Sequence, residues 1–305
     1  MATAGALAWP AMPEMNDLPK QTLGRTGLRV TQLGYGAMEL RGAPRAREIS
    51  DEQAEQILRA VLDSGINYID TSIDYGLSEE RIGRFISGRR DEFFLASKCG
   101  CLAQPAAPPT TTGPSPHVFT RDNVVAGVEQ SLRRLQTDHL DVVQFHASPS
   151  KQVLEEEGAL DALLELQRQG KVRFIGMSGT LPNLPEQIQM GVFDVFQIPY
   201  SAVQTEHEEL ISKAAAAGAG TVIRGGAAKG AWDGSVLDDL LDGASRTEFI
   251  LRYTLSHPDL HTTIVGTANP AHLQANVAAA LKGPLPADVY AEAKRRLAGS
   301  SLQGA

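Results

Sequence analysis

Short apolar runs alternate with longer segments of helical periodicity along almost the whole chain. Buried strands that alternate with helices pair in parallel through right-handed crossovers. Eight such strand–helix units in 305 residues predict an α/β fold of the closed (β/α)₈, or TIM-barrel, type. The expected strands lie at residues 32–37, 66–70, 93–97, 140–145, 172–178, 195–200, 221–225 and 262–266.

A doubly wound open sheet is the competing architecture for the same alternation. Such sheets usually carry a G-x-G-x-x-G turn after an early strand, where the backbone approaches a bound dinucleotide. The corresponding stretch here, GYGAMEL, stops after two glycines. The sequence therefore favours the closed barrel.

The segments outside the repeated units define the domain organisation. Residues 1–18 are expected to form a flexible tail, and residues 19–300 a single barrel domain with an N-terminal β-hairpin and extra C-terminal helices. One connection, 102–119, carries five prolines and is too long for an ordinary connector. In a barrel it emerges on the C-terminal face, either as a substrate-side flap or as a surface excursion.

Composition and charge exclude several classes of partner. The chain is 42% hydrophobic with a net charge of −8 and has no basic run that could neutralise a row of phosphates, so neither nucleic acid nor an anionic membrane is expected as a partner. No segment approaches the ~18 uninterrupted apolar residues of a membrane helix, and the N-terminus lacks the basic region of a signal peptide. We expect a cytoplasmic protein, as a monomer or small homo-oligomer.

The two cysteines, Cys99 and Cys101, are separated by one glycine and cannot cross-link distant parts of the fold. This usage indicates a reducing compartment rather than a disulfide scaffold. A metal or redox role is the alternative to small residues that pack after a strand. Because no Cys or His partner lies nearby in the sequence at ligand spacing, we expect no metal site.

Polar side chains stand at the ends of several expected strands, where catalytic groups of such barrels gather. These are Asp70 with Tyr75 shortly after it, then Lys98, His146 and Ser178. An ammonium favours the phenolate of a nearby tyrosine, and a histidine can orient a carbonyl oxygen. Singly, each residue also has a structural explanation as a turn cap, a solvated strand end or a packing group. Only convergence on one face of one barrel favours proton-transfer chemistry.

At these residues the sequence resembles the aldo-keto reductase superfamily, from about residue 20 to residue 282. IDTSIDYGLSEERIG resembles its Asp-Thr…Tyr-Gly…Ser-Glu…Gly signature, LASK its lysine strand, and SLRRLQTDHLDVVQFH its Ser-Leu-x-x-Leu…Asp…His segment. The resemblance implies a catalytic tetrad of Asp70, Tyr75, Lys98 and His146, with Tyr75 as general acid. It also implies a nicotinamide cofactor bound extended across the barrel mouth, without a Rossmann unit, and a small-molecule carbonyl substrate.

The same resemblance implies a set of cofactor contacts. Ser178 and Gln197 match the positions that hold the carboxamide, and VGTANPAHLQAN matches the segment that grips the adenosine phosphate end. Arg224 stands where many members carry an aromatic ring, and could reach a cofactor phosphate, the substrate or a structural acid. The implied cofactor-binding residues are Ser178, Gln197, Arg224, Gly225, Gly266, Thr267, His272 and Asn276.

Two departures from the family pattern concern the cofactor. Gly179 replaces the asparagine of the usual Ser-Asn carboxamide pair. Where members selective for the phosphorylated cofactor commonly carry Lys or Arg, this chain has Gly266 and His272, neither of which supplies a permanent charge at pH 7. We expect NADP, reduced as NADPH, with NAD as the alternative.

The substrate pocket is expected to include Tyr35 and Met38 after the first strand and Trp232 after the seventh. The leading hypothesis is an NAD(P)H-dependent aldo-keto reductase (EC 1.1.1.-) that reduces an aldehyde or ketone to the alcohol. One alternative is a cofactor-binding regulatory or redox-sensing subunit with vestigial catalysis. The other is an NAD-dependent sugar or alcohol dehydrogenase.

Overall fold

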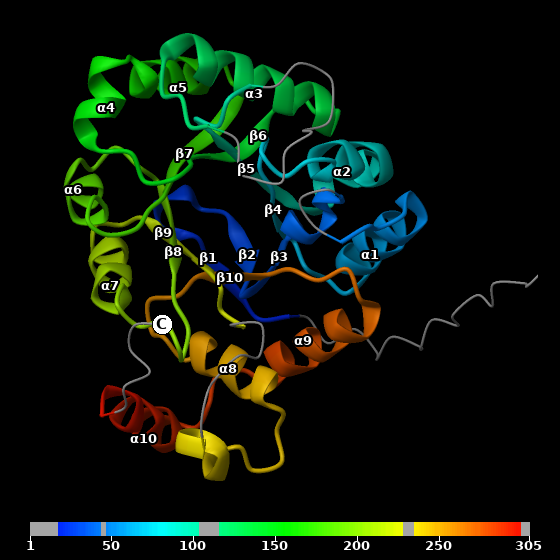
Figure 1. Ribbon diagram of the computed structural model, residues 1–305, viewed down its shortest axis with the longest axis vertical. Coiled ribbons are helices and arrows are strands. Elements are labelled where there is room, and N and C mark those ends of the chain that lie inside the picture. The colour runs from blue at the N-terminus through cyan, green and yellow to red at the C-terminus, as the bar shows by residue number, and fades with distance from the viewer. Residues whose placement is uncertain (1–17, 44–46, 104–115, 228–234, 300–305) are drawn as a thin grey trace, which may run out of the picture.

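Parallel strands close into a barrel in the order β10-β3-β4-β5-β6-β7-β8-β9, and helices ring it on the outside (Figure 1). The computed structural model describes residues 18–43, 47–103, 116–227 and 235–299. The (β/α)₈ prediction is confirmed. The barrel strands are β3 (Leu33–Gly36), β4 (Tyr68–Asp70), β5 (Phe94–Cys99), β6 (Leu140–Phe145), β7 (Val172–Ser178), β8 (Val195–Pro199), β9 (Gly220–Arg224) and β10 (Thr262–Val265).

The helices carry an apolar face toward the strands, as amphipathic segments must in this architecture. The first of them begins at a capping box, in which the Ser50 side chain accepts from the Gln53 N–H and the Gln53 side chain accepts from the Ser50 N–H. The α-helices are α1 (Asp51–Asp63), α2 (Ser78–Ile86), α3 (Arg121–Leu135), α4 (Lys151–Glu156), α5 (Ala159–Arg168), α6 (Leu184–Gln189), α7 (Glu208–Ala216), α8 (Arg246–Leu255), α9 (Pro270–Lys282) and α10 (Ala287–Ala298). Short 3₁₀ helices are η1 (Gly24–Thr26), η2 (Ala37–Arg41), η3 (Ser87–Glu92) and η5 (Ser235–Leu240).

The predicted N-terminal hairpin is confirmed and covers the N-terminal end of the barrel. Its strands β1 (Lys20–Thr22) and β2 (Arg29–Thr31) pair antiparallel. A Cβ on Gly24 would lie 2.3 Å from the Gly220 nitrogen, so the hairpin touches the first residue of β9. Because its apolar side chains enter the barrel interior, that end is closed and the opposite end is left for a site. The interior cluster consists of Leu23, Leu28, Val30, Tyr68, Ala96, Val142, Val195 and Val222.

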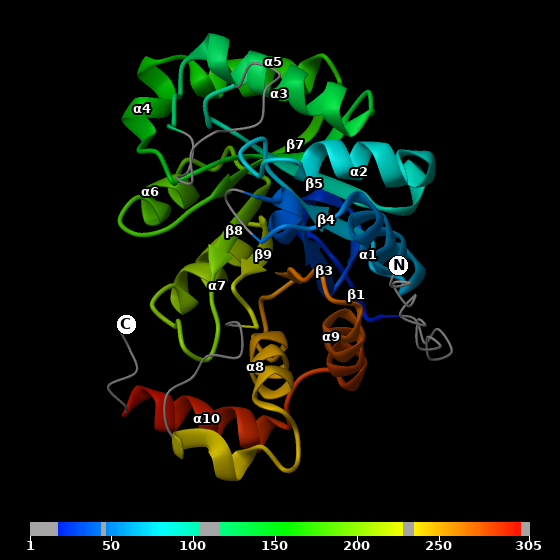
Figure 2. The ribbon, with the colours of Figure 1, turned by 45° about the vertical axis from the view of Figure 1, so that its right-hand side comes forward.

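The C-terminal helix α10 lies at the periphery of the ring, beyond α8 (Figure 2). Arg296 on α10 forms an ion pair with Asp239 on η5, and Lys294 forms one with Glu208 on α7. The extra C-terminal helix is thus attached to the barrel by contacts at both sides. Leu18, expected as the last residue of the tail, is buried in the main core, and residues 1–17 lie outside the described part of the chain.

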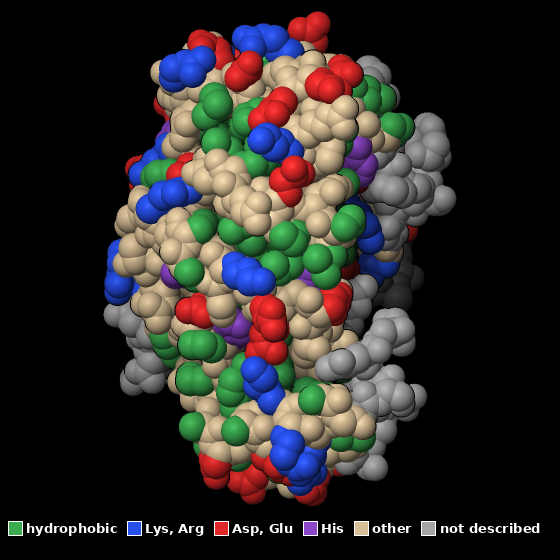
Figure 3. All heavy atoms as spheres, turned by 90° about the vertical axis from the view of Figure 1, so that its left-hand side faces the viewer, with side chains coloured by type: hydrophobic (Ala, Val, Ile, Leu, Met, Phe, Trp, Pro, Cys, Tyr) green, Lys and Arg blue, Asp and Glu red, His purple; other side chains and the backbone are tan. Residues whose placement is uncertain are grey.

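Acidic and basic side chains are interspersed over the face shown in Figure 3, as expected from the spread of charge along the sequence. None of the described helices is both long and apolar enough to cross a membrane.

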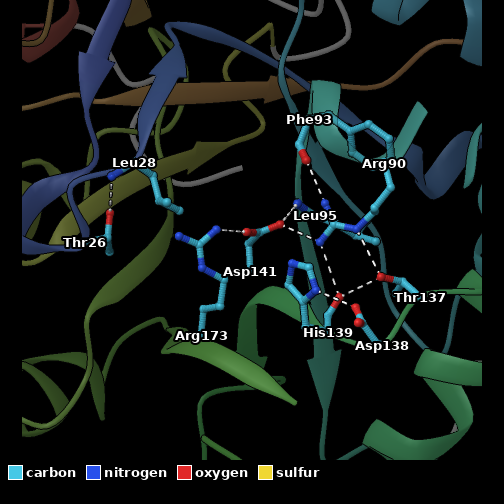
Figure 4. A network of polar contacts seen from close by, with 10 residues as sticks. All are labelled: Thr26, Leu28, Arg90, Phe93, Leu95, Thr137, Asp138, His139, Asp141 and Arg173. Carbon is cyan, nitrogen blue, oxygen red and sulfur yellow. Dashed lines mark hydrogen bonds and ion pairs between the residues drawn. The ribbon is translucent and has the colours of Figure 1, made fainter. Parts of the chain in front are cut away.

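A buried carboxylate organises the polar contacts near the N-terminal ends of β5, β6 and β7 (Figure 4). Asp141 on β6 is 1% exposed. Its Oδ2 accepts from Arg90 at 2.7 Å and from the Leu95 N–H at 2.8 Å, and its Oδ1 accepts from Arg173 at 2.6 Å. Arg90 also donates to the Phe93 carbonyl oxygen. Asp141 therefore joins three neighbouring strands at the end of the barrel opposite the strand ends that carry the predicted site.

We expect Asp141→Ala to lower the free energy of unfolding by roughly 2–4 kcal/mol, because it leaves a buried amide and a half-buried guanidinium without their acceptor. The measurement is the thermal unfolding midpoint. Asp138→Ala is the matched control: this neighbouring carboxylate is 95% exposed and should have little effect. Equal midpoints for the two variants would contradict a structural role for the Asp141 network.

Candidate active site

A cavity of about 550 Å³ opens at the C-terminal ends of the barrel strands. Asp70, Tyr75 and His146 line it, and Lys98 lies directly behind them in contact with Asp70. The structure therefore brings together all four residues that the sequence singled out, although they come from three strand ends and one loop. The sequence favoured proton-transfer chemistry only if these residues met on one face of one barrel, and they do. Separate structural roles for the four residues are therefore disfavoured.

The Asp70–Lys98 ion pair is the centre of the site. The Lys98 ammonium donates to Asp70 Oδ1 at 2.5 Å and to the Thr71 carbonyl oxygen at 2.8 Å, and both charged side chains are almost fully buried. Burial by itself would lower the pKa of Lys98, but the Asp70 carboxylate and the nearby Tyr75 raise it above its usual value. Lys98 is thus a permanent cation in the site at neutral pH.

Tyr75 is carried by the loop between β4 and α2, and its ring centroid lies 5.0 Å from the Lys98 Nζ. Its N–H donates to the Ser72 carbonyl oxygen, which fixes the turn. The next residue, Gly76, has φ of +46°, and a Cβ there would lie 2.4 Å from the Arg41 carbonyl oxygen. Only glycine fits this position, so the tight turn that presents Tyr75 to Lys98 depends on it.

His146 follows β6 and faces Tyr75, with ring centroids 6.2 Å apart. Burial, together with the nearby Lys98 ammonium, lowers the pKa of His146 to about 3. The imidazole is therefore neutral at pH 7 and can donate a hydrogen bond from one ring nitrogen. Ala147 and Ser148, directly after it, both have positive φ, a costly conformation that marks this turn as constrained.

Two glutamines hold the second oxygen of Asp70. Gln144 Nε2 donates to Asp70 Oδ2 at 3.0 Å, and Gln197 Nε2 donates to it at 2.7 Å. Gln197 Oε1 accepts in turn from the Ser178 hydroxyl at 3.2 Å. Ser178 and Gln197, predicted as carboxamide contacts, do line the cavity, and they also belong to the network that orients Asp70.

Sequence reasoning missed Gln144, although a signal was present. In LDVVQF, Val142 belongs to the apolar cluster inside the barrel, and residues two apart on a strand face the same side. Gln144 therefore also points inward, which makes it a buried polar residue one step from the strand end.

The residues predicted to bind the cofactor line two adjoining cavities. Ser178, Gln197, Arg224, Gly225 and Gly266 line the first. Thr267, His272 and Asn276 line a second cavity of about 590 Å³. The two cavities share the residues Glu39, Ala227, Val265 and Gly266.

The adjoining cavities form an elongated site that runs from the tetrad to α9. The second also includes Arg47, a cation that the sequence analysis did not consider. Arg47 precedes α1, far from α9 in the sequence, so only the folded chain places it near His272.

The predicted substrate residues have different outcomes. Met38 lines the first cavity. Tyr35, expected to face the mouth, is instead fully buried, and its hydroxyl donates to the Thr267 carbonyl oxygen at 2.7 Å. The side chain of Tyr35 points into the core, because successive side chains along β3 alternate between its two sides. Its hydrogen bond holds the loop between β10 and α9. Trp232 lies outside the described residues.

Arg224 ends β9 and lines the first cavity. Burial lowers its pKa, while Tyr75 and Asp70 act in the opposite direction. Among the described residues it forms no salt bridge, so the structural pairing with an acid has no support there. Gly179 is the other departure from the family pattern. A Cβ there would lie 2.7 Å from Leu184 Cδ1 and 2.9 Å from Gln187 Oε1, so a larger residue would require these two side chains to shift.

The Cys-Gly-Cys stretch lies beside the tetrad. Cys101 Sγ is 3.0 Å from His146 Nδ1, and the chain returns from residues 104–115, which lie outside the described part, to place His117 next to Cys101. His117 and His146 are 16 and 45 residues from Cys101 in the sequence, too far for the ligand spacing on which the expectation of no metal site depended. In the fold, two histidines adjoin Cys101.

A model of the Aldo/keto reductase family matches residues 32–241, more than half of the chain. The uncharacterized oxidoreductase YqkF of Bacillus subtilis (strain 168) is 26% identical over 291 residues, 86% of this chain and 90% of the relative. L-galactose dehydrogenase of Arabidopsis thaliana is 25% identical over 299 residues, 87% of this chain and 89% of the relative. Among solved structures, the holo form of aldo-keto reductase AKR11C1 from Bacillus halodurans has a TM-score of 0.79 at 27% identity, covering 92% of this chain and 96% of that chain.

The lowered pKa of His146 gives a pH prediction. The imidazole of His146 should stay neutral when the pH is lowered from 8 to 5. NMR titration of the histidine signals measures this, and the signal that is missing in His146→Asn identifies His146. The pKa of His146 is near 6.5 in the unfolded chain and about 3 in the folded chain. Between these two values the unfolded state binds a proton at this histidine and the folded state does not. The free energy of unfolding therefore decreases as the pH falls from 6.5 to about 3. His146→Asn should lessen that fall. Titration of His146 at or above pH 6 would contradict the assignment.

Proposed function

Because the chain belongs to the aldo/keto reductase family of oxidoreductases, we propose that it uses NAD(P)H to reduce an aldehyde or ketone to the alcohol. The observation that carries this proposal is the position of the Lys98 ammonium, 2.5 Å from Asp70 and 5.0 Å from the Tyr75 ring centroid, at the edge of the main cavity. These are the groups needed to make a phenol acidic and aim it at a carbonyl oxygen.

Tyr75 supplies the proton in the proposed reaction. Its ordinary pKa near 10 makes a phenol a weak acid at pH 7, and an adjacent ammonium stabilises the phenolate left after transfer. Asp70 keeps Lys98 charged and fixed, and Gln144 and Gln197 keep Asp70 in place. The neutral imidazole of His146 donates a hydrogen bond to the same carbonyl oxygen and orients it toward Tyr75.

The adjoining cavities fit an extended dinucleotide better than a compact ligand. Ser178 and Gln197 would hold the carboxamide near the tetrad, Arg224 and Gly225 the middle, and Gly266, Thr267, His272 and Asn276 the adenosine end. When bound, the nicotinamide supplies the hydride. The chain's own contribution is to place the carbonyl carbon at the mouth and deliver the proton from Tyr75.

Arg47 supports NADP as the cofactor. The expectation of weak discrimination depended on Gly266 and His272, which carry no permanent charge, but Arg47 lines the same cavity. A guanidinium can bind a 2′-phosphate through two parallel hydrogen bonds.

A second candidate is oxidation of a sugar or alcohol with NAD, in which Tyr75 accepts the proton. It is favoured by the similarity over most of the chain to a relative named L-galactose dehydrogenase. The regulatory-subunit alternative has less support. A relative named probable voltage-gated potassium channel subunit beta is 33% identical, but the match covers only 45% of this chain, and Asp70, Tyr75, Lys98 and His146 are all present and converge.

We expect Tyr75→Phe to reduce turnover at least ~100-fold, the lower end of what a general acid contributes, while cofactor binding is retained. The measurements are steady-state rates on a panel of aldehydes, ketones and sugars in both directions, and quenching of protein fluorescence by the cofactor. Tyr68→Phe is the matched control, since the Tyr68 hydroxyl is buried and makes no hydrogen bond within the described residues. Unchanged rates for Tyr75→Phe would refute the proposed proton donor.

We expect Arg47→Ala to raise the Kd for NADPH by about 10- to 100-fold, the loss of one or two charge-assisted hydrogen bonds, with little effect on NADH. Fluorescence titration with both cofactors measures this. Arg59→Ala, which removes an exposed arginine of α1 paired with Glu55, is the control for net charge. An equal loss of affinity for both cofactors would show that Arg47 does not contact a 2′-phosphate.

A further inference from the structure

A sulfur and two imidazoles meet at the edge of the tetrad, and one of the imidazoles is that of the tetrad residue His146. One ligand atom from each of Cys101, His117 and His146 lies within 4.8 Å of the other two, and the Cys101 Sγ to His146 Nδ1 distance is 3.0 Å. Cys101 is buried, His146 is partly buried and His117 is exposed. The cluster is therefore open to solvent on the His117 side, while His146 faces the main cavity on the other.

The fold holds this cluster on rigid backbone. Cys101 and His117 form an antiparallel bridge, flanked by hydrogen bonds from Leu102 N–H to the Pro116 oxygen and from Val118 N–H to the Gly100 oxygen. The side chain of Asn123 on α3 donates to the Cys101 and Val118 carbonyl oxygens, and so ties both sides of the bridge to the barrel. His117 is thus fixed next to Cys101.

We propose that Cys101, His117 and His146 bind a zinc ion, with a fourth position left for water. One thiolate and two imidazoles are a donor set that zinc prefers, and zinc sites with three protein ligands keep an open position. Bond lengths of about 2.3 Å to sulfur and 2.0 Å to nitrogen place the two donors ~3.5 Å apart in a tetrahedron. The observed Sγ to Nδ1 distance of 3.0 Å is about 0.5 Å shorter than this separation.

The sulfur and nitrogen donor atoms of the cluster favour a soft divalent ion such as Zn²⁺ over a hard one such as Mg²⁺. Binding displaces the thiol proton of Cys101 to solvent, because zinc binds the thiolate form. Lys98 and Arg224 repel a cation there, and Asp74 attracts it. Mg²⁺ prefers oxygen ligands, and the three ligand atoms of this cluster are one sulfur and two nitrogens, so Mg²⁺ should not bind.

Zinc in this position would make the enzyme reversibly inactive. A metal on Nδ1 leaves Nε2–H as the one donor of His146, and a ring anchored in this way cannot turn that donor toward a carbonyl oxygen beside Tyr75. This consequence rests on the proposed reductase function, whereas the metal site itself does not.

The first test is metal binding by the full-length protein without cofactor. Co²⁺ is the spectroscopic probe, because a cysteine thiolate bound to it gives a charge-transfer absorption and a tetrahedral site gives intense visible bands. We expect one equivalent to bind with both features, to be displaced by Zn²⁺ and to be unaffected by Mg²⁺. Cys101→Ala should abolish the charge-transfer band, and Cys99→Ala, the matched control, should retain it.

The third ligand is tested by His117→Gln against His139→Gln, a histidine paired with Asp138 away from the site. His117→Gln should weaken Co²⁺ binding at least ~10-fold, a loss that even an outer partner of a metal can cause. His139→Gln should bind as the wild type does. No charge-transfer band in the wild type, or equal affinity in His117→Gln and the wild type, would overturn the site.

The effect on the reaction is measured separately. Zn²⁺ should suppress carbonyl reduction by the wild type, EDTA should restore it, and His117→Gln should keep its activity at zinc concentrations that inhibit the wild type. Metal binding without inhibition would overturn the regulatory consequence and leave the site standing. If no carbonyl is reduced at all, the proposed function fails while the Co²⁺ result still decides the site.

Discussion

The site depends on one carboxylate, Asp70, whose two oxygens are fully used. One oxygen binds Lys98, and the other accepts from Gln144 and Gln197. A buried ion pair is costly unless its remaining hydrogen-bonding capacity is satisfied, and the two amides supply that capacity. Because these partners stand on β5, β6 and β8, the closed barrel is what brings them to a single carboxylate. The position of Tyr75 relative to Lys98 follows from this arrangement.

The fold could be predicted from the sequence because its main determinants are local. Each barrel strand is a short apolar run, such as LDVVQF at 140–145, and each run lies between segments of helical periodicity. Consecutive parallel strands joined by right-handed crossovers usually lie side by side, and closing eight of them into a barrel places them in chain order. The tetrad could be placed for the same reason, since strand ends define one face.

What could not be predicted depends on which way a side chain turns and on contacts between distant segments. Tyr35 and Met38 are three residues apart, yet Tyr35 enters the core while Met38 reaches the cavity, because the chain changes from β3 to η2 between them. Arg47 and His117 both lie outside the helices and barrel strands. They reach the site through contacts with residues that are distant in the sequence. Neither carries a periodic pattern that would fix its direction, and so both were missed.

The two ends of the barrel treat a buried aspartate differently, and the difference separates stability from chemistry. Asp141, near the N-terminal ends, has two guanidinium partners and a backbone amide, which leaves it electrostatically over-compensated and structurally fixed. Among the described residues Asp70 forms one ion pair, with Lys98, and its other side-chain hydrogen bonds come from the neutral amides of Gln144 and Gln197. A second cation at Asp70 would satisfy the carboxylate without Lys98. With one, the Lys98 ammonium is held 5.0 Å from the Tyr75 ring centroid, where the proposed proton transfer needs a cation.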